Sequence, residues 1–483
     1  MAVTGTRGDL PGFDYHPEAN SSGGVSMPDR RKRPVMFKFP KNKRRRAILV
    51  IATGFLLFVV CAAVIFNPVL TRYVESGGFR EAMNMETAKG LHLATGRYQS
   101  IHRTGFFTAA TAGFDGINGS KTVLSMSTRN ITAKFNPWGV FLRRWQLDDV
   151  HIDSGEVAIH TYEPKPEELP PKPWYSVFLP DRVYLKQVVC DTADVTWQMR
   201  GKKSGFFGTR LLITPHGRDF EYRAAGGTMK MALMPDLKLR GVHLLVTKEL
   251  LTLYNLDLAP DEHGDGTIHV EGKAGLKDDK SVDATMVFSG IPIAPWLPES
   301  WRGHSAGLIS GNVHWSGKNT KLETSSGRGT FRLEHAGVSG LPFLQKLVTI
   351  TGKKSLGTLN PEECAFNAEW DYPKIEFKDI AIEERGKFRI EGTITIDHKA
   401  LGGSIRLGLA REYLDWLPDA ATIFTLRDGN YLWVTVHLSG TVEKPQQDLS
   451  PRIMGMLEDH PGDLLDFFFR SAAESFEKLL NDQ

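Results

Sequence analysis

The stretch WQLDDVHI, residues 145–152, alternates apolar and polar side chains and then breaks its own register. Leu147 follows Trp145 after two positions, Val150 follows after three, and Ile152 after two again. Successive side chains of a strand point to opposite faces, so the step of three requires an extra residue if all four apolar side chains share one face. The octet therefore predicts a β-bulge, which bends and twists the strand that contains it.

The same pattern occurs in VYLKQVVC (183–190), LKLRGVHL (237–244) and IEFKDIAI (375–382). After the octets at 145 and 183, IDSGEVAI and CDTADVTW each predict a four-residue turn and a second strand, so that Val157 corresponds to Val195 at an offset of 38. After the octet at 375, the turn EERG leads into FRIEGTITI. A sheet bulged repeatedly at corresponding places curls. The alternative is that short loops separate independent strands, and periodicity alone does not decide between the two.

The chain beyond residue 99 is mostly strand-like. Segments such as TIHVEG, VDATMVFSG, LISGNVHWSG and YLWVTVHLSG alternate between Gly, Asp, Asn or Pro boundaries, as antiparallel meanders require. Helical periodicity is confined to residues 68–94, 341–350 and 463–480. We therefore expect a mainly β fold: an elongated, curved antiparallel sheet at 99–450, with few helices and a C-terminal amphipathic helix within 451–483.

An uncharged apolar segment precedes this region. Residues 47–66, AILVIATGFLLFVVCAAVIF, are long enough to span the roughly 30 Å hydrocarbon core of a bilayer. The cations of KFPKNKRRR, residues 38–46, place the N-terminus in the cytoplasm by the positive-inside rule. A cleaved signal peptide fits less well, because its apolar run is shorter. We expect a basic, disordered cytoplasmic tail at 1–46, one transmembrane helix at 47–66 and a juxtamembrane helical segment at 67–98.

The sequence offers no privileged site for catalysis. A net charge of +3 is too small to indicate a nucleic-acid binder, and the three cysteines lack the spacing of a zinc site or a disulfide framework. The turn PDEHGDG, with Asp261, Glu262 and Asp265, lacks the ligand order of an EF-hand, and GKKS at 352–355 lacks the leading glycine of a phosphate loop. We expect no metal, no cofactor and no enzymatic activity.

The order of these features resembles that of a known family. An apolar span, a helical segment, TGRYQSIHRTGFFTAATAGFDGI, bulged octets beginning WQLDDVHIDSGEVAI and a late strand ending LSGTVEKPQQDLSP are together similar to the AsmA-like family of bacterial envelope proteins, relatives of TamB. The resemblance covers most of residues 47–450. It implies a single-pass protein of the bacterial inner membrane whose bulk lies in the periplasm, with a β-sheet curved into a groove. Family members are associated with outer-membrane assembly and with phospholipid movement.

These observations lead to a hypothesis about the site. An apolar groove holds acyl chains without any catalytic group, since each buried methylene contributes about 0.8 kcal/mol. We expect the partners to be phospholipid, the inner membrane and outer-membrane assembly proteins, with no nucleic acid. The octet residues predicted to line the groove are Leu147, Val150, Ile152, Leu185, Val188, Leu239, Val242, Phe377 and Ile380.

Two other functions stay open at this point. A structural or assembly scaffold would bind outer-membrane proteins through sheet edges, without lipid. An envelope hydrolase would need a cleft with two placed carboxylates, for which Asp261, Glu262 and Asp265 are the residues to replace.

Overall fold

The computed structural model describes part of the chain in atomic detail. The described residues are 51–55, 57, 67–136, 144–160, 182–199, 201–217, 219–232, 234–260, 265–277, 280–297, 299–318, 322–417 and 419–454. The chain divides into two compact units, Met1–Phe66 and Asn67–Gln483, and the fold below is that of the second. The predicted tail at 1–46 and nearly all of the predicted C-terminal helix lie outside the described residues.

The predicted transmembrane segment is described only at residues 51–55 and 57, which are helical. Among the residues that the structure describes, no helix has the length and apolar character needed to cross a bilayer.

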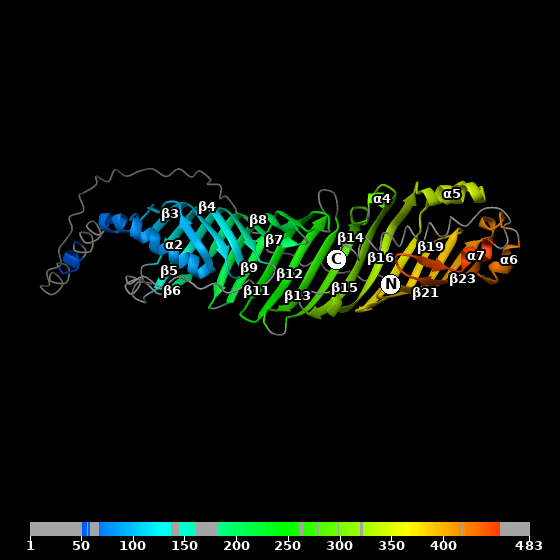
Figure 1. Cartoon of the computed structure of the whole chain (residues 1–483). Helices are drawn as coiled ribbons and strands as arrows, with labels where there is room; N and C mark the ends of the chain where they lie inside the picture. The colour runs from blue at the N-terminus through cyan, green and yellow to red at the C-terminus, as the bar shows by residue number, and fades with distance from the viewer. Residues whose placement is uncertain are drawn as a thin grey trace, which may run out of the picture. The chain divides into compact units, whose positions relative to one another are not determined.

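The second unit is mainly β, and its strands follow one another in chain order (Figure 1). The strands are β1 Leu93–Tyr98, β2 His102–Arg103, β3 Thr108–Gly119, β4 Val123–Phe135, β5 Arg144–Ile159, β6 Arg182–Leu185, β7 Val188–Met199, β8 Lys202–His216, β9 Asp219–Ala225, β10 Thr228–Lys230, β11 Leu237–Val246, β12 Leu250–Pro260, β13 Thr267–Gly275, β14 Ser281–Pro292, β15 Ser305–Lys318, β16 Ser326–Ser339, β17 Thr358–Leu359, β18 Glu363–Asp371, β19 Lys374–Glu384, β20 Phe388–Asp397, β21 Ala400–Ala410, β22 Leu426–Asp428, β23 Tyr431–Gly440 and β24 Pro445–Gln447. All of them belong to one sheet.

Helices are few and short in the described part of this unit. They are α2 Gly77–Leu91, α4 Glu299–Arg302, α5 Pro342–Thr351, α6 Ala420–Ile423 and α7 Leu449–Met454, with 3-10 turns η2 Ala294–Trp296, η3 Leu322–Thr324, η4 Lys354–Gly357 and η5 Arg411–Tyr413. Residues 67–74 are also helical. The helical segment predicted at 67–98 ends earlier than expected, because His92 adopts a left-handed conformation that caps α2, and residues 93–98 form β1.

The sheet is an antiparallel meander with one exception. Strand β5 pairs with β6 and β7 in parallel, and Val157 lies opposite Val195, its counterpart at the offset of 38. The predicted repeat is thus a pair of neighbouring strands in register. The all-antiparallel expectation is wrong at this junction, and the turns expected inside IDSGEVAI and CDTADVTW do not form, since β5 and β7 run through them. The turn at EERG is confirmed between β19 and β20.

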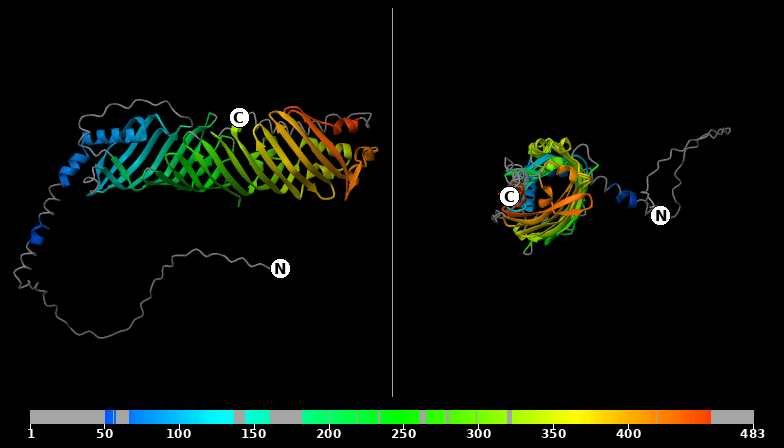
Figure 2. Two further views of the ribbon diagram at one scale, coloured as in Figure 1. Left: turned by 90° about the horizontal axis from the view of Figure 1, so that it is seen from below. Right: turned by 90° about the vertical axis from the view of Figure 1, so that its right-hand side faces the viewer.

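The bulges predicted from the octets are confirmed in three strands. Asp148 is the extra residue of β5, Arg240 that of β11, and β19 places Lys378 and Asp379 opposite one residue of β20. The octet 183–190 is different, because its step of three falls between two strands, β6 and β7. These strands pair with β5 on either side of the β5 bulge. The alternative of short separate strands therefore holds there. Viewed along its length, the sheet curls so that one face lies on the inside (Figure 2).

Candidate functional site

The inner face of the sheet, defined here as the face that carries Ile152, Val242 and Phe377, bears a row of apolar residues that are direct partners from strand to strand. We call it the Ile152 row. Its members, in order from β4 to β23, are Ile131, Ile152, Cys190, Leu211, Ala224, Val242, Leu256, Val270, Met286, Val313, Gly329, Ala368, Phe377, Ile394, Gly403 and Leu438. No member carries a charge.

A second row runs beside the first, two residues away along most strands. We call it the Val150 row. Its members, from β3 to β21, are Ala109, Ala133, Val150, Val188, Ile213, Tyr222, Leu244, Leu253, Gly272, Ala284, Trp315, Gly327, Trp370, Ile375, Ile396 and Leu401. Side chains two apart on a strand share a face, so the two rows form one apolar band.

Aromatic rings extend the band on β14, β16, β18 and β19. The ring of Phe331 lies 6.0 Å from that of Phe288 and stacks on that of Phe366 at 4.8 Å. Phe366 in turn lies 5.9 Å from Phe377, edge to face. These contacts add to the apolar area because offset and edge-to-face ring pairs are favourable in themselves.

The two rows are only half-buried over the middle of the sheet. In the Ile152 row this holds for every member from Leu211 to Val313, and in the Val150 row for every member from Ile213 to Ile375. Apolar side chains in a closed core would be fully buried. The middle of the inner face therefore presents accessible apolar surface.

Both ends of the inner face are covered. At the N-terminal end, α2 packs on Phe114 and Leu93 through Ala88, and this cluster reaches Ile131 of the Ile152 row. At the C-terminal end, Leu414, Leu417 and Phe424 of the segment 411–425 pack on Val434, Val436 and Leu438 of β23. The two ends of the band are thus covered. Between them, Leu258, Ile268 and Phe288 form part of a buried cluster, and the rows beside that cluster stay half-buried.

The nine residues predicted to line a groove fall into two groups. Val150, Leu185, Val188, Val242, Phe377 and Ile380 are half-buried, and all but Leu185 and Ile380 belong to the two rows. Leu147, Ile152 and Leu239 are buried, with Leu239 packed in a cluster with Leu237, Leu258 and Ile268. Leu239 is therefore not accessible in this structure, and its assignment to a groove stays a prediction.

Reasoning from the octets missed most of the accessible band. Val270, Met286, Val313 and Trp315 lie on β13, β14 and β15, which contain no octet. The signal that could have found them is the alternation within TIHVEG, VDATMVFSG and LISGNVHWSG, which assigns each of these residues to the apolar phase. The octets mark where strands bend, not where the apolar face is accessible.

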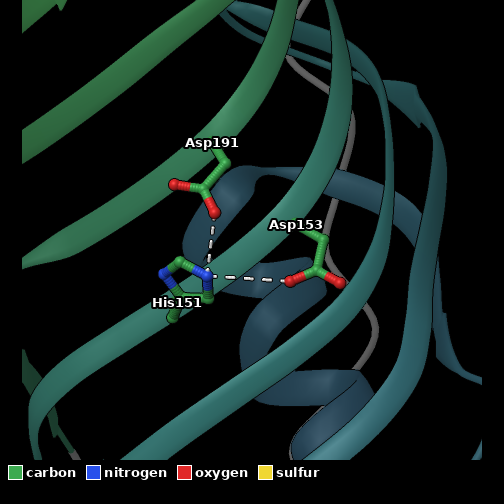
Figure 3. A group of neighbouring side chains, drawn as sticks. All are labelled: His151, Asp153 and Asp191. Carbon is green, nitrogen blue, oxygen red and sulfur yellow. Dashed lines mark ion pairs between the residues drawn. The ribbon is translucent and has the colours of Figure 1, made fainter.

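The outer face carries ion pairs between neighbouring strands. Figure 3 shows His151 between Asp153 and Asp191, with Nε2 3.6 Å and 3.1 Å from the carboxylate oxygens. These three groups are close enough to share a metal ion. All are exposed, and Arg210 lies 3.7 Å from Asp191, so charge pairing between side chains accounts for the arrangement.

A second cluster on the outer face centres on Glu221. His243 Nε2 lies 2.7 Å from one of its carboxylate oxygens and His216 Nε2 2.8 Å from the other, while Arg223 contacts the first. Bonds from His216 and then Arg223 outweigh desolvation and lower the pKa of Glu221 from its usual 4.5 to about 2. The carboxylate is therefore ionised at any physiological pH, which suits a structural ion pair and not a general acid.

Two further features of the sheet involve titratable side chains. A shallow hollow over β15, β16, β18 and β19 is bordered by Arg332, Glu363 and Asp379 on the polar face. Cys190 lies in the apolar band, where burial raises the pKa of its thiol, so it is not an activated nucleophile. Neither feature forms a catalytic arrangement. Of the carboxylates predicted for a hydrolase, Asp261 and Glu262 lie outside the described residues.

Comparisons of the chain with protein-family models, with curated proteins and with solved structures found no match.

Proposed function

We propose that this chain binds phospholipid by its acyl chains along the inner face of the sheet and guides lipid across the periplasm. In this proposal it is an AsmA-like protein held in the bacterial inner membrane by residues 47–66, with its second unit in the periplasm, supporting outer-membrane assembly. The observation that carries the proposal is the half-buried middle of the Ile152 and Val150 rows. The exposure of Ile51, Phe55 and Leu57 within the apolar segment supports the membrane anchor.

The dimensions of the band suit acyl chains. Each row crosses sixteen strands, which at a spacing of about 4.8 Å makes it roughly 70 Å long. One acyl chain extends about 15 Å, half of the ~30 Å hydrocarbon core of a bilayer. A row therefore has room for several chains end to end, and each buried methylene contributes about 0.8 kcal/mol.

The absence of charge in both rows constrains how a lipid would lie. Moving a phosphate or ammonium group into apolar surroundings without a partner is strongly unfavourable. A phospholipid on this face would place its acyl chains against the rows and keep its head group in water. Such binding selects for apolar length and not for one head group.

The scaffold alternative depends on free sheet edges, and side chains already bond the described edge strands. Asp448 accepts a hydrogen bond from the main-chain N–H of His437, and Arg452 donates to the carbonyl of Thr435, both on β23. At the other end, Asn84 of α2 accepts from the N–H of Tyr98 on β1. Strand addition would have to displace these bonds, so the sheet edges favour the lipid proposal.

The test is native mass spectrometry of residues 67–483, expressed in the periplasm and purified without detergent. We expect adducts with the mass of one or more phospholipids, released when the gas-phase complex is activated. A protein that is folded by circular dichroism and carries no lipid would contradict the proposal. Crosslinks in cells that trap envelope proteins and no lipid would favour the scaffold.

A further inference from the structure

The turn between β2 and β3 exposes two adjacent aromatic rings. Phe106 is 48% and Phe107 42% exposed, and their rings meet edge to face at 4.7 Å. Strand β3 begins at the next residue, Thr108, and Ala109 starts the Val150 row. The aromatic pair therefore stands immediately beside the strand on which the apolar band begins.

Arg103 ties this turn to the helical residues 67–74. Its Nη1 donates to the carbonyl of Asn67 at 3.0 Å and to the hydroxyl of Thr71 at 3.0 Å, and it also contacts the amide oxygen of Asn67. Its Nη2 donates to the carbonyl of Phe106 at 2.8 Å, and the guanidinium lies over the Phe106 ring at 5.2 Å. One side chain thus fixes the aromatic turn against the first turn of this helix.

The same helix presents further apolar surface beside a cation. Val69 and Tyr73 are among the exposed large apolar residues, and Arg72 is exposed between them. Exposed Tyr and Phe rings together with a nearby Arg are typical of segments at the interface between bilayer and water. Asn67, which Arg103 holds, directly follows Phe66, the last residue of the apolar segment.

We propose that Val69, Tyr73, Phe106 and Phe107 form an interfacial anchor that docks this end of the sheet onto a lipid surface, the leaflet in which the segment 47–66 ends. The inference rests on the membrane anchor of the proposed function and adds the place where the sheet meets the bilayer. The Arg103 bonds hold Phe106 and Phe107 beside Asn67, so a span that ends at Phe66 brings both rings to the interfacial region. The apolar band then begins next to the lipids that it would receive.

The experiment uses the full chain with its three cysteines replaced by alanine, reconstituted in phosphatidylcholine–phosphatidylglycerol vesicles. Single cysteines replace Phe107, Val69 or Tyr254 and carry an environment-sensitive fluorophore. Tyr254 is the matched control, because it is an aromatic residue of β12 that is 48% exposed and lies in the middle of the sheet. Vesicles with and without spin-labelled phosphatidylcholine then report contact with lipid.

We expect blue-shifted emission and quenching by spin-labelled lipid at positions 107 and 69, and neither effect at position 254. Arg103→Gln should reduce quenching at 107 and leave it unchanged at 69. Quenching at 69 without quenching at 107 would overturn the inference, and so would equal quenching at 254. A chain that does not float with the vesicles would overturn the membrane anchor and the inference together.

The outcome is separable from that of the lipid-binding proposal. If position 107 is quenched while the second unit carries no phospholipid in native mass spectrometry, the interfacial anchor stands and the proposed function fails. If phospholipid is bound while position 107 is not quenched, the inference fails alone. Replacing Phe106 by serine, with folding checked by circular dichroism, should weaken the vesicle-dependent blue shift of a probe at Phe107 and leave that of a probe at Val69 unchanged.

Discussion

The middle and the ends of the inner face share one sequence pattern and differ in what covers them. At the ends, Phe114 and Val434 are each 2% exposed, beneath α2 and the segment 411–425. In the middle, Val242 and Met286 occupy the same kind of strand position and stay half-buried. Alternation of apolar and polar residues therefore identifies a face of a sheet but does not say whether another element packs on it.

The difference follows from the placement of the few helices. A sheet face gains stability when a second layer covers it, and α2 and the segment 411–425 lie next to the first and last strands of the inner face, whereas in the middle Trp296 of the 3-10 turn η2 packs on the buried cluster. The middle keeps its apolar side chains without a second layer of comparable extent. A closed core at both ends stabilises the sheet, and the middle carries the half-buried rows to which the proposed function assigns the lipid.

The largest effect is expected at a closed end. Val434→Asp places a carboxylate in the covered cluster of β23 without a partner of opposite charge, and it should lower the free energy of unfolding by about 4 kcal/mol or more. Urea denaturation followed by circular dichroism measures this change. A loss below about 1 kcal/mol would mean that the C-terminal end is as accessible as the middle.

A smaller loss of unfolding free energy is expected at Gly327 of β16, where neighbouring atoms leave no room for a larger side chain. A Cβ at Gly327 would lie 2.4 Å from the Trp370 ring and 2.2 Å from the carbonyl oxygen of His314. Gly327→Val should therefore cost about 1–3 kcal/mol of unfolding free energy. Gly402→Val on β21, where no atom lies within 4 Å of the added Cβ, is the control and should change the urea midpoint less. Equal losses at the two glycines would contradict the packing.

A charged side chain placed in the half-buried middle of the inner face tests whether that region differs from the covered ends. Val242→Asp should reduce bound phospholipid strongly in native mass spectrometry while lowering the free energy of unfolding by no more than about 2 kcal/mol. Val287→Asp, at a position that is 48% exposed in β14, should change neither quantity. If Val242→Asp unfolds the protein as Val434→Asp does, the middle is an ordinary closed core.

The smallest effect concerns pH and the outer face. The pKa of Glu221 is lowered to about 2, so its ionised form stabilises the fold above pH 4.5, and this contribution is lost as the pH falls from 4.5 toward 2. Glu221→Gln should flatten the pH dependence of the thermal midpoint in that window. Phospholipid binding at neutral pH should not change, because Glu221 pairs with side chains on the outer face. An unchanged acid profile would show that the cluster contributes nothing.

Residue spacing in the sequence correctly predicted several features of the sheet. The step of three in the octets correctly located bulges at Asp148, Arg240 and Asp379, because an apolar face is kept only if one residue is added there. The offset of 38 correctly related Val157 to Val195. Spacing did not reveal that these strands run parallel, since parallel and antiparallel neighbours have the same period of two.

The candidate site was only partly predictable. Val242 and Phe377 were selected from the sequence because they adjoin predicted bulges, whereas Val270 and Met286 lie in TIHVEG and VDATMVFSG, which contain no octet. The burial of Leu239 was not predictable because it depends on contacts with Leu258 and Ile268, which are distant in sequence. Whether a face is covered is a tertiary property, and a single strand does not encode it.

Because strands pair side by side along the sheet, the number of strands that a row crosses sets the length of that row. Each neighbouring strand lengthens both rows by about 4.8 Å, so one inserted hairpin would extend the reach of the inner face by about 10 Å and leave both covered ends unchanged. The number of strands therefore sets the length of the inner face, and the length of each strand sets its width.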